Sequence, residues 1–224
     1  WKRCSKVYSR KKLVLKIINI VVGIENVNIL SNVSFNVAKF TSVIGRNGAG
    51  KTTLIRSIMR ILKLDSGNIE FYDTNLTNSE TSSLTSIGIG YMPEDRRLIP
   101  NLSVKENILL PLWSNKLINE NNKLEEVIEF IPEIKSFLNS DAYQLSGGQQ
   151  KLVSLARAMI IGKKLLLLDE PFEGVAPALA ERLAELIINL NKLKLITMIT
   201  ESDDTYSKVI GAEIVKLERG KIIS

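Results

Sequence analysis

Residues 45–52 read Gly45-Arg46-Asn47-Gly48-Ala49-Gly50-Lys51-Thr52 and fit the pattern G-x-x-x-x-G-K-[ST]. A short apolar run at residues 42–44 precedes it, and apolar residues recur at helical spacing through residues 52–62. A strand, a glycine-rich loop and a helix in this order are the context that a phosphate-binding loop requires. The sequence therefore predicts a P-loop at this position.

The chemistry of this loop suits a nucleoside triphosphate. Glycines let consecutive backbone N–H groups point at a phosphate, and the N-terminus of the following helix adds its positive dipole end. Lys51 would reach the β- and γ-phosphates, and the Thr52 hydroxyl would be a ligand of Mg²⁺. The candidate nucleotide contacts are Gly45, Arg46, Asn47, Gly48, Ala49, Gly50, Lys51, Thr52 and Thr53.

A second motif places two carboxylates at the end of a buried strand. Residues 165–168 are all leucine, as expected for a parallel strand covered on both faces, and Asp169, Glu170 and Pro171 follow. Ligand sites in open α/β sheets lie at the carboxyl ends of the strands. We therefore expect Asp169 to hold Mg²⁺, directly or through water, and Glu170 to polarise the attacking water.

A third motif is a second glycine-rich helix start, Leu145-Ser146-Gly147-Gly148-Gln149. Ser146 suits the N-cap position, and the helix N-terminus is a second potential anion site. These two interpretations are compatible. The candidate anion contacts here are Ser146, Gly147, Gly148 and Gln149.

The remaining pattern predicts an α/β fold. Apolar or alternating runs predict strands at residues 13–22, 33–37, 67–71, 87–92 and 195–199 and a hairpin over 213–223, and helical periodicity covers 152–160 and 179–193. Polar, Asn- and Lys-rich segments broken by prolines fill the region after residue 93. We expect one domain over 1–224, with a nucleotide-binding core at 1–93 and 161–224 and a helical subdomain at 94–160.

The composition excludes several kinds of catalytic, metal and disulfide sites. The chain of 224 residues has no histidine and one cysteine, which excludes a Ser-His-Asp triad, a His-ligated metal and an internal disulfide. The net charge is +6, with a basic segment over residues 2–16. That segment has two interpretations, a solvated arm or a contact with anionic lipid headgroups. No uninterrupted apolar run approaches the roughly 18 residues of a membrane-spanning helix.

With these motifs in this order, the sequence resembles the ATP-binding subunits of ABC transporters over nearly its whole length. Residues 91–104 read YMPEDRRLIPNLSV, followed by Glu106 and Asn107, and resemble a stretch of the importers for branched-chain amino acids and related amides. Residues 172–177, FEGVAP, are similar to a segment of the same subgroup. The resemblance implies a P-loop NTPase fold with a mainly parallel core sheet, an antiparallel β subdomain and the helical insertion.

The resemblance also implies partners and a mechanism. Two ATP-binding subunits, identical or different, would hold two ATP molecules head to tail, each between one P-loop and the partner's Ser146-Gly147-Gly148 turn. ATP binding would close the dimer and drive a transmembrane permease docked near Glu94, served indirectly by a periplasmic substrate-binding protein. The implied place is peripheral, on the cytoplasmic side of the inner membrane. The implied cofactors are ATP and Mg²⁺, and no nucleic-acid partner is expected.

The sequence departs from the family pattern at four places. Ser202 stands where the family has a histidine near the γ-phosphate, which makes Ser202 a candidate catalytic residue without a positive charge. Glu94 replaces a usual glutamine and is a candidate Mg²⁺ ligand. Val22 stands near where an aromatic ring would stack on adenine, and the turn over residues 37–42 is short.

Two alternatives to an active transport ATPase stay open, and the departures motivate the first of them. The first is a degenerate subunit that binds ATP and completes a partner's site but hydrolyses little itself. The second is an ABC ATPase that acts on DNA, which the absence of room for coiled-coil or other nucleic-acid elements argues against.

Overall fold

The computed structural model describes residues 15–37, 39–72, 74–114, 120–193 and 195–223. Most of the predicted basic segment, residues 2–14, lies outside the described residues. The strands are β1 Leu15–Ile24, β2 Val27–Val37, β3 Phe40–Ile44, β4 Ser66–Phe71, β5 Thr74–Asn75, β6 Ile89–Met92, β7 Leu165–Asp169, β8 Ile196–Glu201, β9 Glu213–Glu218 and β10 Lys221–Ile223. The helices are α1 Lys51–Ile58, α2 Thr81–Ser86, α3 Val104–Ser114, α4 Glu120–Phe130, α5 Gly147–Ile161, α6 Pro177–Lys192 and α7 Thr205–Val209, and two short 3₁₀ segments span Pro132–Phe137 and Ala142–Gln144.

The central element is a six-stranded sheet in the order β10-β9-β3-β8-β7-β6. The five strands β9, β3, β8, β7 and β6 run parallel to one another. Strand β10, at one edge of this sheet, pairs antiparallel with β9 and forms the predicted hairpin. The parallel arrangement brings the carboxyl ends of β3, β7 and β8 to one edge. This edge is where the P-loop and the carboxylates of the second motif begin.

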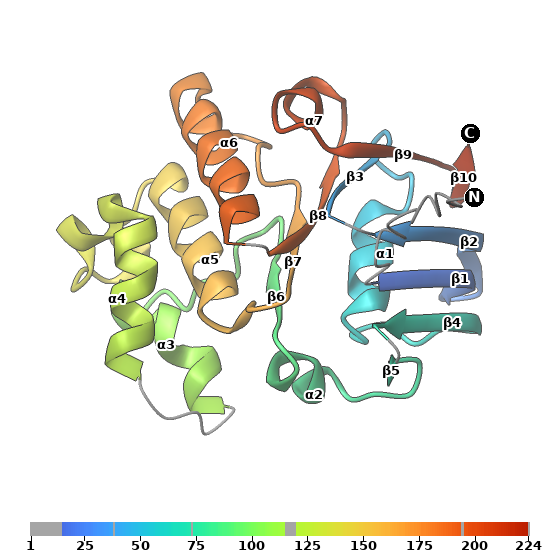
Figure 1. Cartoon of the computed structure of the whole chain (residues 1–224), viewed down its shortest axis with the longest axis horizontal. Coiled ribbons are helices and arrows are strands. Elements are labelled where there is room, and N and C mark those ends of the chain that lie inside the picture. The colour runs from blue at the N-terminus through green and yellow to red at the C-terminus, as the bar shows by residue number, and fades with distance from the viewer. Residues whose placement is uncertain (1–14, 38, 73, 115–119, 194, 224) are drawn as a thin grey trace, which may run out of the picture.

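A second, antiparallel sheet has the order β2-β1-β4-β5. Its strand β2 alternates buried Val33 and Val37 with exposed Ser34 and Asn36, as the period of two predicts. Figure 1 shows α1 between this sheet and the central one, in agreement with its contacts to β2, β7 and β8. The predicted antiparallel β subdomain is confirmed.

Helices α3, α4 and α5 form the helical part of the molecule, on the far side of the central sheet from α1 (Figure 1). In the described residues between β6 and β7, the backbone is helical or irregular, apart from an isolated bridge between Ser103 and Asp141. The mainly parallel core, the antiparallel sheet and the helical region together confirm the predicted fold class. None of the described helices has both the length and the apolar character needed to cross a bilayer.

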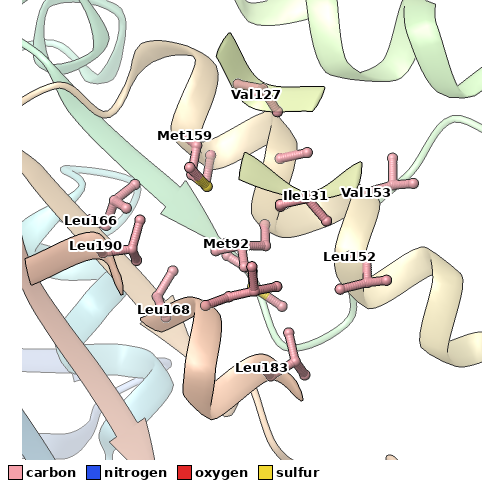
Figure 2. Close-up of a cluster of buried hydrophobic side chains, with 14 of the residues drawn as sticks. Met92, Val127, Ile131, Leu152, Val153, Met159, Leu166, Leu168, Leu183 and Leu190 are labelled. Atoms are coloured by element: carbon pink, nitrogen blue, oxygen red, sulfur yellow. The ribbon is translucent and has the colours of Figure 1, made fainter. Parts of the chain in front are cut away.

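Strand β7 separates two hydrophobic cores. Leu165 and Leu167 point into the core around α1 and the antiparallel sheet, whereas Leu166 and Leu168 point into the core beneath α5 and α6. Figure 2 shows the second core, where Leu166 and Leu168 meet side chains of α4, α5 and α6. All four leucines are fully buried, which explains the uninterrupted apolar run.

Element boundaries differ from the sequence patterns at two helix ends. Helix α1 ends at Ile58 rather than at Leu62, because Arg60 adopts a left-handed φ of 57° that a helix cannot continue through. Leu193 lies beyond the end of α6 and is 55% exposed, so it is not part of the buried stripe.

Candidate nucleotide-binding site

The P-loop connects β3 to α1 and is shaped by its glycines. A Cβ on Gly45 would overlap the carbonyl oxygen of Leu217, so the loop can pass β9 only without a side chain there. Gly50 has a φ of 105°, and a Cβ on it would lie 2.8 Å from Leu30 Cδ2. Gly48, at φ 83°, faces open space. The loop therefore presents bare backbone to whatever lies beside residue 48.

A cavity of about 470 Å³ opens beside this loop. It gathers residues from four separate segments, namely β2, the P-loop with the start of α1, the end of β6, and the end of β7. Its lining consists of Ile29, Asn47, Gly48, Gly50, Lys51, Thr52, Thr53, Glu94 and Glu170. The structure thus brings most of the predicted P-loop contacts together with the predicted catalytic glutamate.

Lys51 is held by the protein itself. Its side chain is 3% exposed, and its ammonium donates to the carbonyl oxygens of Gly45 at 2.6 Å and Arg46 at 3.3 Å. It also forms an ion pair with Glu170 Oε1 at 3.0 Å. A triphosphate entering the cavity must therefore compete with Glu170 for this cation.

Glu170 has an unusual backbone and a crowded carboxylate. Its φ of 46° is in the left-handed region, which a non-glycine residue adopts only when its surroundings enforce it. Burial acts to raise the pKa of Glu170, but hydrogen bonds from Glu173 and Lys51 outweigh it, so the pKa is lowered. The hydrogen bond between the two carboxyl groups raises the pKa of Glu173, so Glu170 is the ionised partner of the pair and Glu173 the protonated one. An ionised Glu170 is the form that a general base requires.

Asp169 is buried and carries one oxygen that lacks a partner. Its Oδ1 accepts from Thr200 Oγ1 at 2.6 Å and from Thr52 Oγ1 at 3.4 Å, whereas Oδ2 has no hydrogen-bond partner. Burial raises the pKa of this carboxyl, against the hydrogen bonds from Thr200 and Thr52. A free carboxylate oxygen beside a threonine hydroxyl fits a divalent cation that takes its other ligands from phosphates and water.

Protein ligands alone do not complete such a site. Among the described residues, no group of three or more His, Cys, Asp or Glu side chains is arranged to hold a metal ion. Glu94 lines the same cavity, and its charge contributes to the raised pKa of Asp169. Its role as a metal ligand stays a prediction.

Ser202 lies between the P-loop and Glu170, the predicted catalytic glutamate. Its hydroxyl is 3.0 Å from Asn47 Oδ1 and 3.4 Å from Glu170 Oε2. Because a hydroxyl carries one proton, it donates fully to one of these acceptors at a time. The serine at the predicted switch position thus contacts both the loop and Glu170.

The third motif lies apart from this cavity. Ser146 caps α5: its hydroxyl accepts from Gln149 N at 3.3 Å, and Gln149 Oε1 accepts from Ser146 N at 2.9 Å. This capping box confirms the predicted N-cap. Ser146 and Gly147 are exposed, and residues 146–149 are absent from the lining of the cavity.

Two residues of the site were not singled out from the sequence. Thr200 on β8 fixes Asp169, and Ile29 on β2 lines the cavity beside Gly48. The expectation that Val22 stands at an adenine position is wrong, because Val22 is fully buried in the hydrophobic core and cannot face a ligand. The P-loop context could have pointed to the strand that packs on the loop, but no local pattern marks Ile29.

A second and larger cavity, about 550 Å³, touches the other side of the P-loop. It is lined by residues 44–49, 202–204, 216–219 and 223. Lys51, Thr52 and Glu170 do not line it, so these predicted site residues gather at the smaller cavity. Ser202 and Asn47 lie where the two cavities approach each other.

Comparison with known proteins agrees with this geometry. The pattern that defines the ABC transporter family matches residues 30–173. The chain is 28% identical to the probable branched-chain amino acid transport ATP-binding protein LivF of Archaeoglobus fulgidus, over 88% of this chain and 89% of that protein. It is 35% identical to the molybdate/tungstate import ATP-binding protein WtpC of Methanocaldococcus jannaschii, over 87% of this chain and 65% of that protein.

A solved structure with the same fold is the ATP-binding cassette MJ0796, described as dimeric, in a post-hydrolysis state and bound to ADP and Pi. The TM-score is 0.83 at 25% identity, covering 94% of this chain and 97% of that one. This chain therefore belongs to the ABC transporter family, as an ATP-binding cassette. Cassettes of this family are ATPases.

Proposed function

We propose that this chain binds ATP with Mg²⁺ in the smaller cavity and hydrolyses it to drive transport through a membrane permease. The observation that carries the proposal is that two separate segments meet at one site: Lys51 and Thr52 begin α1, and Asp169 and Glu170 lie at the end of β7. Lys51, Thr52 and Glu170 line the cavity, and Asp169 contacts Thr52 behind it. An incomplete set would favour a degenerate subunit. All four groups are present, which supports an active ATPase over a degenerate subunit.

Lys51, Glu170 and Ser202 have different roles in the proposed hydrolysis. Lys51 exchanges Glu170 for phosphate oxygens, which frees the glutamate as the nucleotide enters. Glu170, ionised, then accepts a proton from the attacking water, and the backbone of the P-loop with Lys51 stabilises charge on the transferred phosphoryl group. Ser202 donates its one hydroxyl proton to either Asn47 or Glu170, and in the second case it helps to orient the carboxylate.

Thr52 and Asp169 are the residues that would hold Mg²⁺, because their oxygens lie together and Asp169 Oδ2 lacks a partner. When bound, the ion supplies positive charge that offsets the negative charge of the phosphates. Glu94 is the third candidate, at the edge of the same cavity. The adenine would lie against Ile29, an aliphatic contact in place of an aromatic ring.

Two copies would act together. The Ser146 turn is an exposed helix N-terminus away from its own chain's cavity, so it is free to contact a nucleotide held by a partner. The dimer described for MJ0796 supports this arrangement. Closure by ATP would move the helical part, residues 94–160, against a permease, at the inner face of a membrane.

The transported substrate is proposed to be a branched-chain amino acid or a related amide, taken up from a binding protein. Support comes from the stretch 91–107 and from the relative named for branched-chain amino acid transport. The molybdate/tungstate relative has a higher identity, so the test must include both classes. Uptake of labelled leucine and of molybdate by cells with and without the gene decides between them.

The first test of the proposed reaction uses Glu170→Gln. We expect phosphate release to fall at least about 100-fold, because the base is lost, while ATP binding tightens several-fold, because Lys51 is freed from its carboxylate partner. Phosphate release and equilibrium ATP binding measure the two effects. Unchanged turnover would remove Glu170 from the reaction.

A further inference from the structure

Lys151 is a buried cation that the proposed reaction does not use. It lies on α5 and is 1% exposed. Its ammonium donates to the backbone carbonyl oxygen of Glu170 at 2.6 Å. In the described part of the chain, this carbonyl is its hydrogen-bond acceptor, and no ion pair accompanies it.

Packing alone does not explain a lysine at this position. A buried ammonium loses its hydration, and burial accordingly lowers the pKa of Lys151, with Arg96 adding to the effect. An apolar side chain of similar length would avoid this cost, and buried charges are weak contributors to stability. The retained charge points instead to the group that it binds.

That group is the strained backbone of the catalytic glutamate. Glu170 has a left-handed φ of 46° and is held from two sides. Its N–H donates to Thr200 at 3.1 Å, to the carbonyl oxygen, and at 3.2 Å, to the hydroxyl. Its carbonyl accepts from Lys151 and from Glu173 N at 3.2 Å. Such a conformation persists only where the surroundings fix it.

The orientation of the carboxylate follows from this backbone. The left-handed turn directs Glu170 toward Lys51 and Ser202 in the nucleotide cavity. Without the ammonium at its carbonyl, the peptide could relax toward an ordinary φ, and the carboxylate would leave that direction. Catalytic geometry tolerates little displacement of the base.

We propose that Lys151 is a positioning residue for ATP hydrolysis, which anchors the main chain of Glu170 so that its carboxylate faces the nucleotide. The inference rests on the proposed function. Lys151 also lies little more than one helical turn from the Ser146 cap. The alternative role is therefore that Lys151 stabilises only the Ser146 turn, which would contact the nucleotide held by the partner. The two roles differ in what they predict for dimer formation.

The experiment compares the wild-type chain with Lys151→Met, Glu170→Gln and Lys163→Met. Lys163→Met is the matched control, because it removes an exposed lysine ammonium just after the same helix. Phosphate release gives kcat and KM for ATP, and size-exclusion chromatography with ATP and Mg²⁺ gives the dimer. If Lys151→Met does not fold, Lys151→Gln, whose side chain ends one bond earlier, replaces it.

We expect Lys151→Met to lower kcat by 10- to 100-fold, a range set by loss of positioning, with KM within about twofold. It should accumulate an ATP-bound dimer, as Glu170→Gln does, because the Ser146 turn still functions. Lys163→Met should match the wild type.

Three results would overturn the role of Lys151 and leave the proposed function standing. They are an unchanged kcat in Lys151→Met, a fall in kcat accompanied by loss of the ATP-bound dimer, and failure of both Lys151 variants to fold. A wild type that releases no phosphate, or a Glu170→Gln chain that forms no ATP-dependent dimer, would overturn the proposed function and this inference with it.

Discussion

Individual residues set the charge balance of the site. Lys51 and Glu170 neutralise each other at 3.0 Å with little exposure to solvent. Asp169 is buried beside them with one free oxygen. The ion pair satisfies both groups, and the negative charge of a triphosphate can displace Glu170 from Lys51.

Ser202 supplies a neutral hydrogen bond where the family has an ionisable ring. We expect Ser202→Ala to lower kcat about fivefold with KM nearly unchanged, since a single long hydrogen bond of 3.4 Å from an uncharged donor contributes about 1 kcal/mol. Steady-state phosphate release measures both constants. A loss of 100-fold or more would show that the hydroxyl does more than orient Glu170.

Glu201 gives the fold a pH dependence. Burial raises the pKa of Glu201 to about 8, from an ordinary value of 4.5, against the hydrogen bond from Phe172 N. Between these values the folded chain holds a proton that the unfolded chain releases. Its stabilising contribution is therefore complete below about pH 4.5 and is lost as the pH rises to about 8, at no more than about 1.4 kcal/mol per pH unit.

Replacing this residue tests the sign. In Glu201→Gln the titrating group is absent, so the free energy of unfolding should fall less than in the wild type between pH 5 and about pH 8. Urea unfolding at several pH values provides both curves. Parallel curves for the two proteins would contradict a buried, protonated Glu201.

The sequence predicted the residues whose identity is fixed by local motifs, such as Lys51, Thr52 and Asp169. It did not indicate Lys151 or Thr200, because a lysine in a helix and a threonine in a strand are ordinary locally. Their partners lie 19 and 31 positions away along the chain, and only the tertiary fold brings them together.

At the scale of elements, α5 connects three parts of the site. Its first turn carries the Ser146 cap, and Lys151 reaches Glu170. Near its end, Arg157 donates to the carbonyl oxygens of Arg97, at 2.7 Å, and Arg96. Both acceptors have left-handed backbones, so the helix fixes the loop that follows Glu94.

Removing this attachment should loosen the loop. We expect Arg157→Met to lower the free energy of unfolding by about 2 kcal/mol, since hydrogen bonds from a charged group contribute about 1.5–3 kcal/mol, and to speed tryptic cleavage after Arg96 and Arg97. Arg182→Met, which breaks a partly exposed ion pair with Glu133, is the control and should cost less than about 1 kcal/mol. Equal cleavage rates would contradict the role of Arg157.

Element types were predictable, and their ends were less so. The four leucines of β7 and the alternation of β2 announced strands, because burial on two faces and on one face leave different patterns. The early end of α1 was not visible, because Arg60 at φ 57° is a residue that local rules favour in a helix.

For the whole molecule, the nucleotide cavity and the Ser146 turn lie on different parts of one chain. In the proposed dimer, each copy would contribute its nucleotide cavity to one site and its Ser146 turn to the other. We expect Glu170→Gln to dimerise with ATP and Mg²⁺, and Glu170→Gln combined with Ser146→Arg to remain monomeric, because the bulky cation blocks an exposed turn. Light scattering at equal protein concentration distinguishes the two states.

The proposed reaction requires Mg²⁺-nucleotide to bind in the cavity formed by residues 47–53 and the end of β7. Calorimetric titration of folded Glu170→Gln with ATP and Mg²⁺ measures this binding. We expect a saturable heat with one nucleotide per chain, and binding at least about tenfold weaker when Lys51→Ala is added, since a lost charged contact costs about 1.4 kcal/mol or more. No saturable heat, or equal affinity with and without Lys51, would contradict the proposed binding.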